Sequence, residues 1–161
     1  MRNERNDHHA RVIVGVDNQE GSMAALQCAA EEARRRNAVL VAVAVWSPFG
    51  GDIAERTYPC PQLDAFQKAS AVTMLESACE RAGLPDDLTV ERRVEKGFLG
   101  PVLANLANGP HDLLVVGLRY RQGFSWLRPS TDKYCLRYAA APVLVVPSGW
   151  ASCAAEPALI A

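Results

Sequence analysis

The sequence predicts an α/β fold in which a five-stranded parallel sheet carries helices on both faces. Five short apolar runs alternate with segments of helical spacing, the order typical of parallel sheets. Most of the runs are apolar at consecutive rather than alternate positions, as in strands covered from both sides. The length of 161 residues suits one domain. The expected strands are Arg11–Asp17, Val39–Val45, Leu88–Glu95, Asp112–Val116 and Pro142–Pro147.

Local signals place the helices and the connections between them. Ser22 is expected to cap the first helix, and Gly83, followed by Pro85, ends the second. Pro101 falls in the first turn of the third helix, where proline is tolerated. Three prolines within 47–61 predict a long loop there. The expected helices are 22–37, 62–82, 98–108 and 130–139.

Composition and charge narrow the classes of function. A formal net charge of −1 argues against nucleic-acid binding, which normally needs a basic excess. The longest apolar run, 38–46, is the length of a strand, so no membrane association is expected. The polar N-terminus is not a secretory signal, and five cysteines without a C-x-x-C pair suit a reducing compartment. We expect a cytoplasmic protein whose domain, 11–147, lies between a flexible N-terminal tail at 1–10 and a C-terminal tail at 148–161.

The strand order indicates a binding site at one edge of the sheet. Ligands of such sheets bind beyond the carboxyl ends of the strands, and Asp17, Val45 and Gly117 all lie at such ends. The sequence offers no metal-ligand cluster, no Ser-His-Asp set in a workable order and no lysine beside the glycine. We therefore expect binding rather than catalysis, with slow nucleotide hydrolysis as the upper limit.

A loop between the fourth strand and the last helix is the candidate phosphate site. The strand ends at Gly117, and the helix opens at Ser130 and Thr131, whose backbone N–H groups and hydroxyls suit phosphate oxygens. In the structural alternative, Gly117 serves only a tight turn and Ser130 only a helix cap. The loop also carries three arginines, Arg119, Arg121 and Arg128.

Five segments between Arg11 and Pro147 form a recognisable set: VIVGVD, VLVAVAV, KGFLGPVLANLA, DLLVVGLRYRQGF and APVLVVP. In this order they resemble the universal stress protein family. The final block, from the VVG strand end through a loop and a helix to APVLVVP, is the most specific part. The resemblance implies an adenine nucleotide alpha hydrolase-like fold, which is of Rossmann type, and a role in stress response.

The ATP-binding members of that family carry G-x2-G-x9-G-[ST] after the fourth strand. Laid on this sequence, the motif falls on Gly117, Tyr120, Ser130 and Thr131, so one of its three glycines is present. Glycine lets backbone approach a phosphate closely, whereas Tyr120 adds a ring and Ser130 adds a Cβ. Asp132 adds a negative charge that repels phosphate unless a cation offsets it. The resemblance thus implies an altered phosphate half of the pocket.

The nucleoside half of the pocket matches the family better. Asp17 corresponds to the aspartate beside the adenosine portion, and Val45 corresponds to the position whose backbone meets adenine. The family commonly dimerises through its last strand, here Pro142–Pro147, whose apolar residues are expected at the sheet edge. A homodimer is therefore implied.

Three interpretations remain open. The main expectation is a dimeric regulatory module of the stress response with weak or lost ATP binding and an unidentified protein partner. The alternative is a stress protein that binds an adenine nucleotide, ATP or AMP, as its ligand. The third, an enzyme of related α/β architecture such as a nucleotidyl transferase or an electron-transfer flavoprotein subunit, has the least support because no catalytic set is found.

Overall fold

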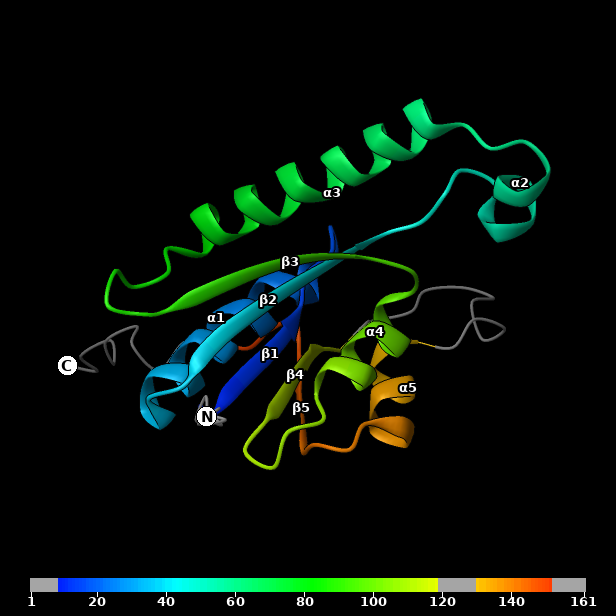
Figure 1. The fold of residues 1–161 in the computed structure, drawn as a ribbon. Helices are drawn as coiled ribbons and strands as arrows, with labels where there is room; N and C mark the ends of the chain where they lie inside the picture. The colour runs from blue at the N-terminus through cyan, green and yellow to red at the C-terminus, as the bar shows by residue number, and fades with distance from the viewer. Residues whose placement is uncertain (1–8, 119–129, 152–161) are drawn as a thin grey trace, which may run out of the picture.

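The computed structural model describes residues 9–118 and 130–151. Its strands form one parallel sheet in the order β3-β2-β1-β4-β5, which confirms the predicted fold class (Figure 1). The strands are β1 Arg11–Gly15, β2 Val39–Trp46, β3 Val90–Lys96, β4 Leu113–Gly117 and β5 Val143–Val146. The helices are α1 Glu20–Arg36, α2 Gly51–Thr57, α3 Pro61–Ala82, α4 Leu99–Leu106 and α5 Thr131–Tyr138. Strand order reverses at β1, which pairs with β2 on one side and β4 on the other. The expected site edge therefore lies at the reversal point.

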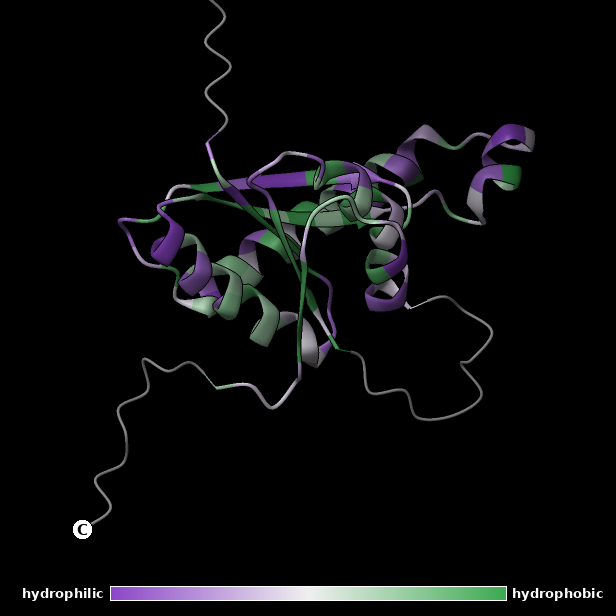
Figure 2. Ribbon diagram, turned by 90° about the horizontal axis from the view of Figure 1, so that it is seen from below, coloured by the Kyte–Doolittle hydropathy of each residue, from purple (hydrophilic) through white to green (hydrophobic). Residues whose placement is uncertain are grey.

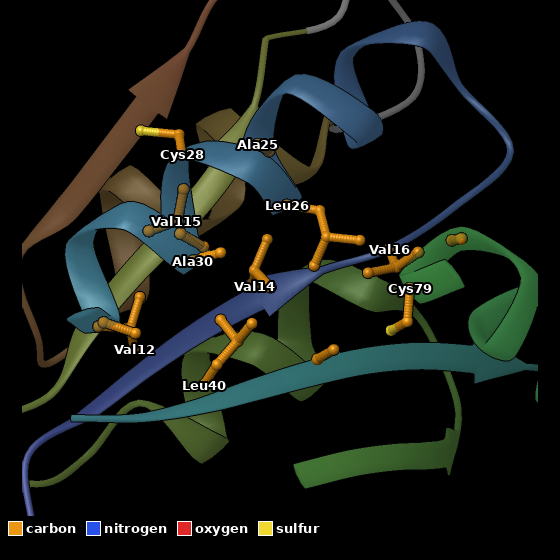
Figure 3. Packing of buried hydrophobic residues seen from close by; sticks show 14 of the residues in the cluster. Val12, Val14, Val16, Ala25, Leu26, Cys28, Ala30, Leu40, Cys79 and Val115 are labelled. Carbon is orange, nitrogen blue, oxygen red and sulfur yellow. The ribbon is translucent and has the colours of Figure 1, made fainter. Parts of the chain in front are cut away.

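Alternate residues of the strands face two separate cores. Val12 and Val14 of β1 pack against α1, and the same core reaches the inner side of α3 (Figure 3). Ile13 of β1 faces the opposite side, where it joins Val41 of β2 and Leu103 of α4. Both faces of the central strands are thus buried, which explains why their sequences are apolar without alternation. Figure 2 shows hydrophobic residues concentrated in the strands and hydrophilic ones on much of the helical surface.

The first helix begins earlier than the sequence predicts. Gln19 occupies the N-cap position and Glu20 is the first helical residue, so the prediction of Ser22 as the cap was wrong. The Ser22 hydroxyl instead accepts a hydrogen bond of 2.9 Å from the backbone N–H of Asp17. The helix ends at Asn37, in the left-handed region at φ 50°, as the sequence predicts. Ser22 therefore ties the helix to the end of β1.

The expected loop over 47–61 contains a short helix, α2. Two of its prolines, Pro48 and Pro59, lie outside the helices, and the third, Pro61, begins α3. Gly50 and Gly51 both adopt φ 78°, which lets the chain turn sharply into α2. No residue of α2 is buried, and Figure 1 shows it apart from the sheet, beyond the start of α3. An ion pair of 2.6 Å between Glu55 and Lys96 joins α2 to the end of β3. The proline count thus predicted the loop's position but not its helix.

An ion pair fastens the amino ends of β1 and β4. The Arg11 guanidinium donates to both carboxylate oxygens of Asp112, at 3.0 and 2.6 Å, and to the Leu106 carbonyl oxygen at 3.0 Å. Burial alone would raise the pKa of Asp112, but hydrogen bonds from Arg11 and from the Gly109 backbone hold that pKa below its usual value. The pair lies at the opposite end of the strands from the expected site.

Candidate functional site

The carboxyl ends of β1 and β4 enclose a small cavity together with the start of α1 and the start of α5. Its volume is about 20 Å³. Three of the predicted residues, Asp17, Gly117 and Thr131, contribute to its lining. The structure therefore brings together groups that the sequence separates widely. The cavity is lined by Gly15, Asp17, Gln19, Gly21, Ser22, Leu99, Leu103, Val116, Gly117 and Thr131.

Two glycine backbones meet at the rim of this cavity. A Cβ placed on Gly117 would overlap the carbonyl oxygen of Gly21. A Cβ on Gly21 would lie 2.8 Å from the carbonyl oxygen of Leu118. Neither contact tolerates a side chain, because backbone atoms cannot swing aside as the end of a side chain can. Gly117 therefore has a packing role in addition to the binding role proposed from the sequence.

A compact turn fixes Asp17 at the end of β1. Its Oδ1 accepts a hydrogen bond of 2.9 Å from the Gln19 backbone N–H, while its own N–H donates to Ser22 Oγ. The side chain is partly exposed and lines two adjoining cavities, the small one and another of about 220 Å³ that reaches Arg81. The carboxylate is thus held by the backbone at the mouth of the site.

Val45 lies beside this site rather than in the small cavity. It lines a wider cleft of about 460 Å³ between the end of β2 and the middle of α3. Asn18, which follows Asp17, lines this cleft and also the cavity of about 220 Å³, so those two hollows meet at this turn. Trp46 lies at the cleft wall, with the Lys96 ammonium 5.7 Å from its ring centroid. The arrangement provides an apolar and aromatic wall next to a carboxylate.

The start of α5 holds two buried polar side chains. Ser130 occupies the N-cap position, as predicted, but its side chain makes no cap hydrogen bond. Ser130 Oγ and Asp132 Oδ1 are buried and have no hydrogen-bond partner in the described part of the chain. Thr131, between them, lines the small cavity. The helix start therefore presents backbone N–H groups and hydroxyls as expected, together with a carboxylate.

The remaining predicted positions lie outside the described residues. They are Arg119, Tyr120, Arg121 and Arg128, which belong to the loop over 119–129. The predicted electrostatic contribution of these arginines therefore stays a prediction.

Sequence reasoning missed two parts of the cavity. Leu99 and Leu103 of α4 form its apolar wall, and Gly21 forms its contact with the glycine of β4. The helical spacing of the leucines predicts an inward face but not the element they face. The glycine falls in a segment read as a simple turn, and nothing local distinguishes it.

Sequence comparison gives the family. The sequence profile of the Universal stress protein family matches residues 9–147, which is most of the chain. The protein belongs to the universal stress protein family. Among curated proteins, no significant match is found.

Solved structures of other universal stress proteins share this fold. One, described in complex with cAMP, is 24% identical, covers 87% of this chain and 98% of its own, and has a TM-score of 0.63. A family member from Burkholderia pseudomallei is 25% identical, with coverages of 86% and 96% and a TM-score of 0.58. One from Archaeoglobus fulgidus, in complex with dAMP, is 16% identical, with coverages of 86% and 98% and a TM-score of 0.57.

Across 9–118 and 130–151, no group of three or more His, Cys, Asp and Glu side chains is arranged to hold a metal ion. In the same ranges, no helix of this universal stress protein has the length and apolarity to cross a membrane.

Proposed function

We propose that this universal stress protein binds an adenosine-containing compound at the carboxyl ends of β1, β2 and β4. The observation that carries the proposal is the small cavity in which Asp17, Gly117 and Thr131 meet. These are the residues that the family resemblance assigns to the two halves of a nucleotide. Two structural relatives are described with cAMP and with dAMP, which supports an adenine ligand for this protein also.

The candidate site has two parts. The part around Asp17 and Val45 suits the nucleoside, and the other part lies toward α5. Asp17 is fixed by the Gln19 and Ser22 contacts and lines both the small cavity and the adjoining cavity of about 220 Å³. Its neighbour Asn18 lines that second cavity and also the cleft beside Val45. A carboxylate held in this way accepts hydrogen bonds from ribose hydroxyls. Val45 and Trp46 line the neighbouring cleft, where an aromatic and aliphatic wall suits a purine ring. The start of α5 then faces whatever substituent the nucleoside carries.

Isothermal titration with adenosine, AMP, cAMP and ATP tests this proposal. We expect at least one of the four to bind. We expect Asp17→Ala to weaken that binding by about tenfold or more, which is the effect of losing one charged hydrogen bond. Asp86→Ala removes an exposed carboxylate elsewhere and should leave the affinity unchanged. Circular dichroism of both variants shows whether they fold. Failure of all four compounds to bind, or an unchanged affinity in Asp17→Ala, would contradict the assignment.

A regulatory dimer with weak ATP binding is the second candidate function. It is favoured by β5, which forms a sheet edge and has three half-exposed apolar residues, Val143, Leu144 and Val145. An apolar edge strand pairs readily with another chain, so we propose a homodimer through Pro142–Pro147. Light scattering over a range of concentrations tests it, and a monomer at high concentration would exclude this interface.

We further propose that a bound nucleotide is retained rather than turned over. Incubation with ATP, followed by chromatography of the nucleotides, measures this. Release of ADP or AMP above the rate of a no-protein control would contradict it.

A further inference from the structure

Two unpaired acceptor atoms lie buried at the start of α5. Ser130 is 4% exposed and Asp132 is 7% exposed, and neither Ser130 Oγ nor Asp132 Oδ1 has a hydrogen-bond partner in the described part of the chain. Buried polar groups in proteins are nearly always paired, because an unpaired one loses its hydration without compensation. These two atoms therefore need a partner that the described protein does not supply.

The two atoms flank the residue that lines the site. Thr131 stands between them and contributes to the small cavity, together with Gly117 and the α4 leucines. Asp132 lies on the inward side of α5, three residues before Cys135, whose Sγ donates to the Gly100 carbonyl oxygen of α4 at 3.8 Å. Asp132 therefore follows a cavity-lining residue directly in the chain and is buried on the same helix as Cys135, which contacts α4.

The chemistry of these groups favours a hydrogen-bond donor over an anion. An ionised carboxylate only accepts hydrogen bonds, and a hydroxyl can also accept. The start of a helix favours one negative charge through its dipole and free N–H groups, and Asp132 already places one in the first turn. A phosphate brought to the same turn would meet a like charge in a poorly solvated region. A ligand hydroxyl would instead donate to an unpaired oxygen.

We propose that Asp132 is a specificity-determining residue that makes the site select adenosine, with a neutral hydroxyl facing α5, over adenine nucleotides with a phosphate there. The inference rests on the proposed adenosine site. It goes further than that proposal, because it makes one residue of this chain, Asp132, decide whether the ligand carries a charge at the end that faces α5.

Isothermal titration of wild type, Asp132→Asn and Asp132→Val with adenosine and AMP tests the inference. We expect the wild type to bind adenosine about tenfold or more tightly than AMP, the size of one uncompensated like-charge contact near a surface. Asp132→Asn keeps the shape of the side chain but removes the like-charge contact. The affinity of this variant for AMP should therefore come to within about threefold of its affinity for adenosine. Asp132→Val, which also removes the acceptor, should weaken adenosine binding and strengthen AMP binding.

The control and the opposing outcomes separate this inference from the function on which it rests. Asp86→Asn neutralises an exposed carboxylate elsewhere and should leave the adenosine-to-AMP ratio as in the wild type. A wild type that prefers AMP, or a ratio that Asp132→Asn leaves unchanged, would overturn the inference while the adenosine site stands. If neither compound binds any form, the inference fails, and the proposed site fails with it only if cAMP and ATP also do not bind.

Discussion

Gly21 of α1 and Gly117 of β4 pack backbone against backbone, with the Gly21 carbonyl oxygen occupying the space where a Cβ on Gly117 would stand. This contact fixes how closely the first turn of α1 approaches the end of β4. It therefore sets the width of the cavity that holds Asp17 and Thr131. A family glycine associated with phosphate binding thus also closes the fold at this point.

Gly117→Ala should destabilise the protein. The added methyl group would overlap a backbone oxygen, so β4 and α1 must separate, at a cost of about 1–3 kcal/mol. Urea unfolding followed by circular dichroism measures the free energy of unfolding. Gly149→Ala is the matched control, because nothing lies within 4 Å of a Cβ at that position. If Gly117→Ala lowers the free energy of unfolding no more than this control does, the contact between Gly21 and Gly117 is not tight in solution.

The Arg11–Asp112 pair should make stability depend on pH in the acid range. The folded-state pKa of Asp112 is lowered, so its contribution is complete above the unfolded value of about 3.9 and is lost as the pH falls through the folded pKa. Arg11 stays charged throughout this range. Arg11→Met should lower the free energy of unfolding by about 2 kcal/mol at pH 7, because the nearly buried carboxylate loses its charged donor.

The difference between wild type and Arg11→Met should be constant from pH 8 to 5 and narrow below about pH 4. Urea unfolding at several pH values measures it. Arg34→Met provides the comparison, since Arg34 and Asp87 are 55% and 69% exposed and such pairs contribute at most about 1 kcal/mol. An equal loss in both variants, or a difference that does not change in acid, would contradict the prediction.

The cysteines should differ sharply in reactivity. Burial, with a smaller effect of the Asp132 charge, raises the pKa of the Cys135 thiol to about 11, and burial also raises the pKa of Cys28. At pH 8 the Cys135 thiolate is then outnumbered by thiol by roughly a thousand to one. Cys60 is exposed. Iodoacetamide labelling in a Cys153→Ser background, read by peptide mass spectrometry, should modify Cys60 first, and early labelling of Cys135 would contradict the structure.

Helix α2 should move independently of the domain when its ion pair is broken. Glu55→Gln weakens the contact with Lys96, and α2 buries no residue that would hold it otherwise. Faster amide hydrogen exchange is expected in 51–57, with an unchanged melting temperature. Glu76→Gln on the exposed side of α3 serves as the control. Exchange in α2 that stays as slow as in the wild type would show that other contacts hold the helix.

Local sequence patterns predicted most of the fold because each strand carries its own burial signal. Val12, Val14 and Ile13 are apolar without alternation since both faces of β1 are covered. Asn37 and Gly83 mark helix ends through their own backbone preferences, and both adopt left-handed conformations in the structure. The role of Ser22 could not be read in this way, because its hydroxyl serves the backbone of Asp17 rather than its own helix.

The sequence by itself determined the parallel α/β order, the family and the carboxyl-end positions of Asp17 and Gly117, because these follow from local apolar periodicity and short motifs. Only the tertiary structure decided that Gly21 meets Gly117 and that Ser130 and Asp132 are buried at the start of α5. These facts depend on how segments distant in the chain come together, and no local pattern encodes the distance between them. The burial of the acidic residue at the start of α5 is therefore a property of packing as much as of sequence.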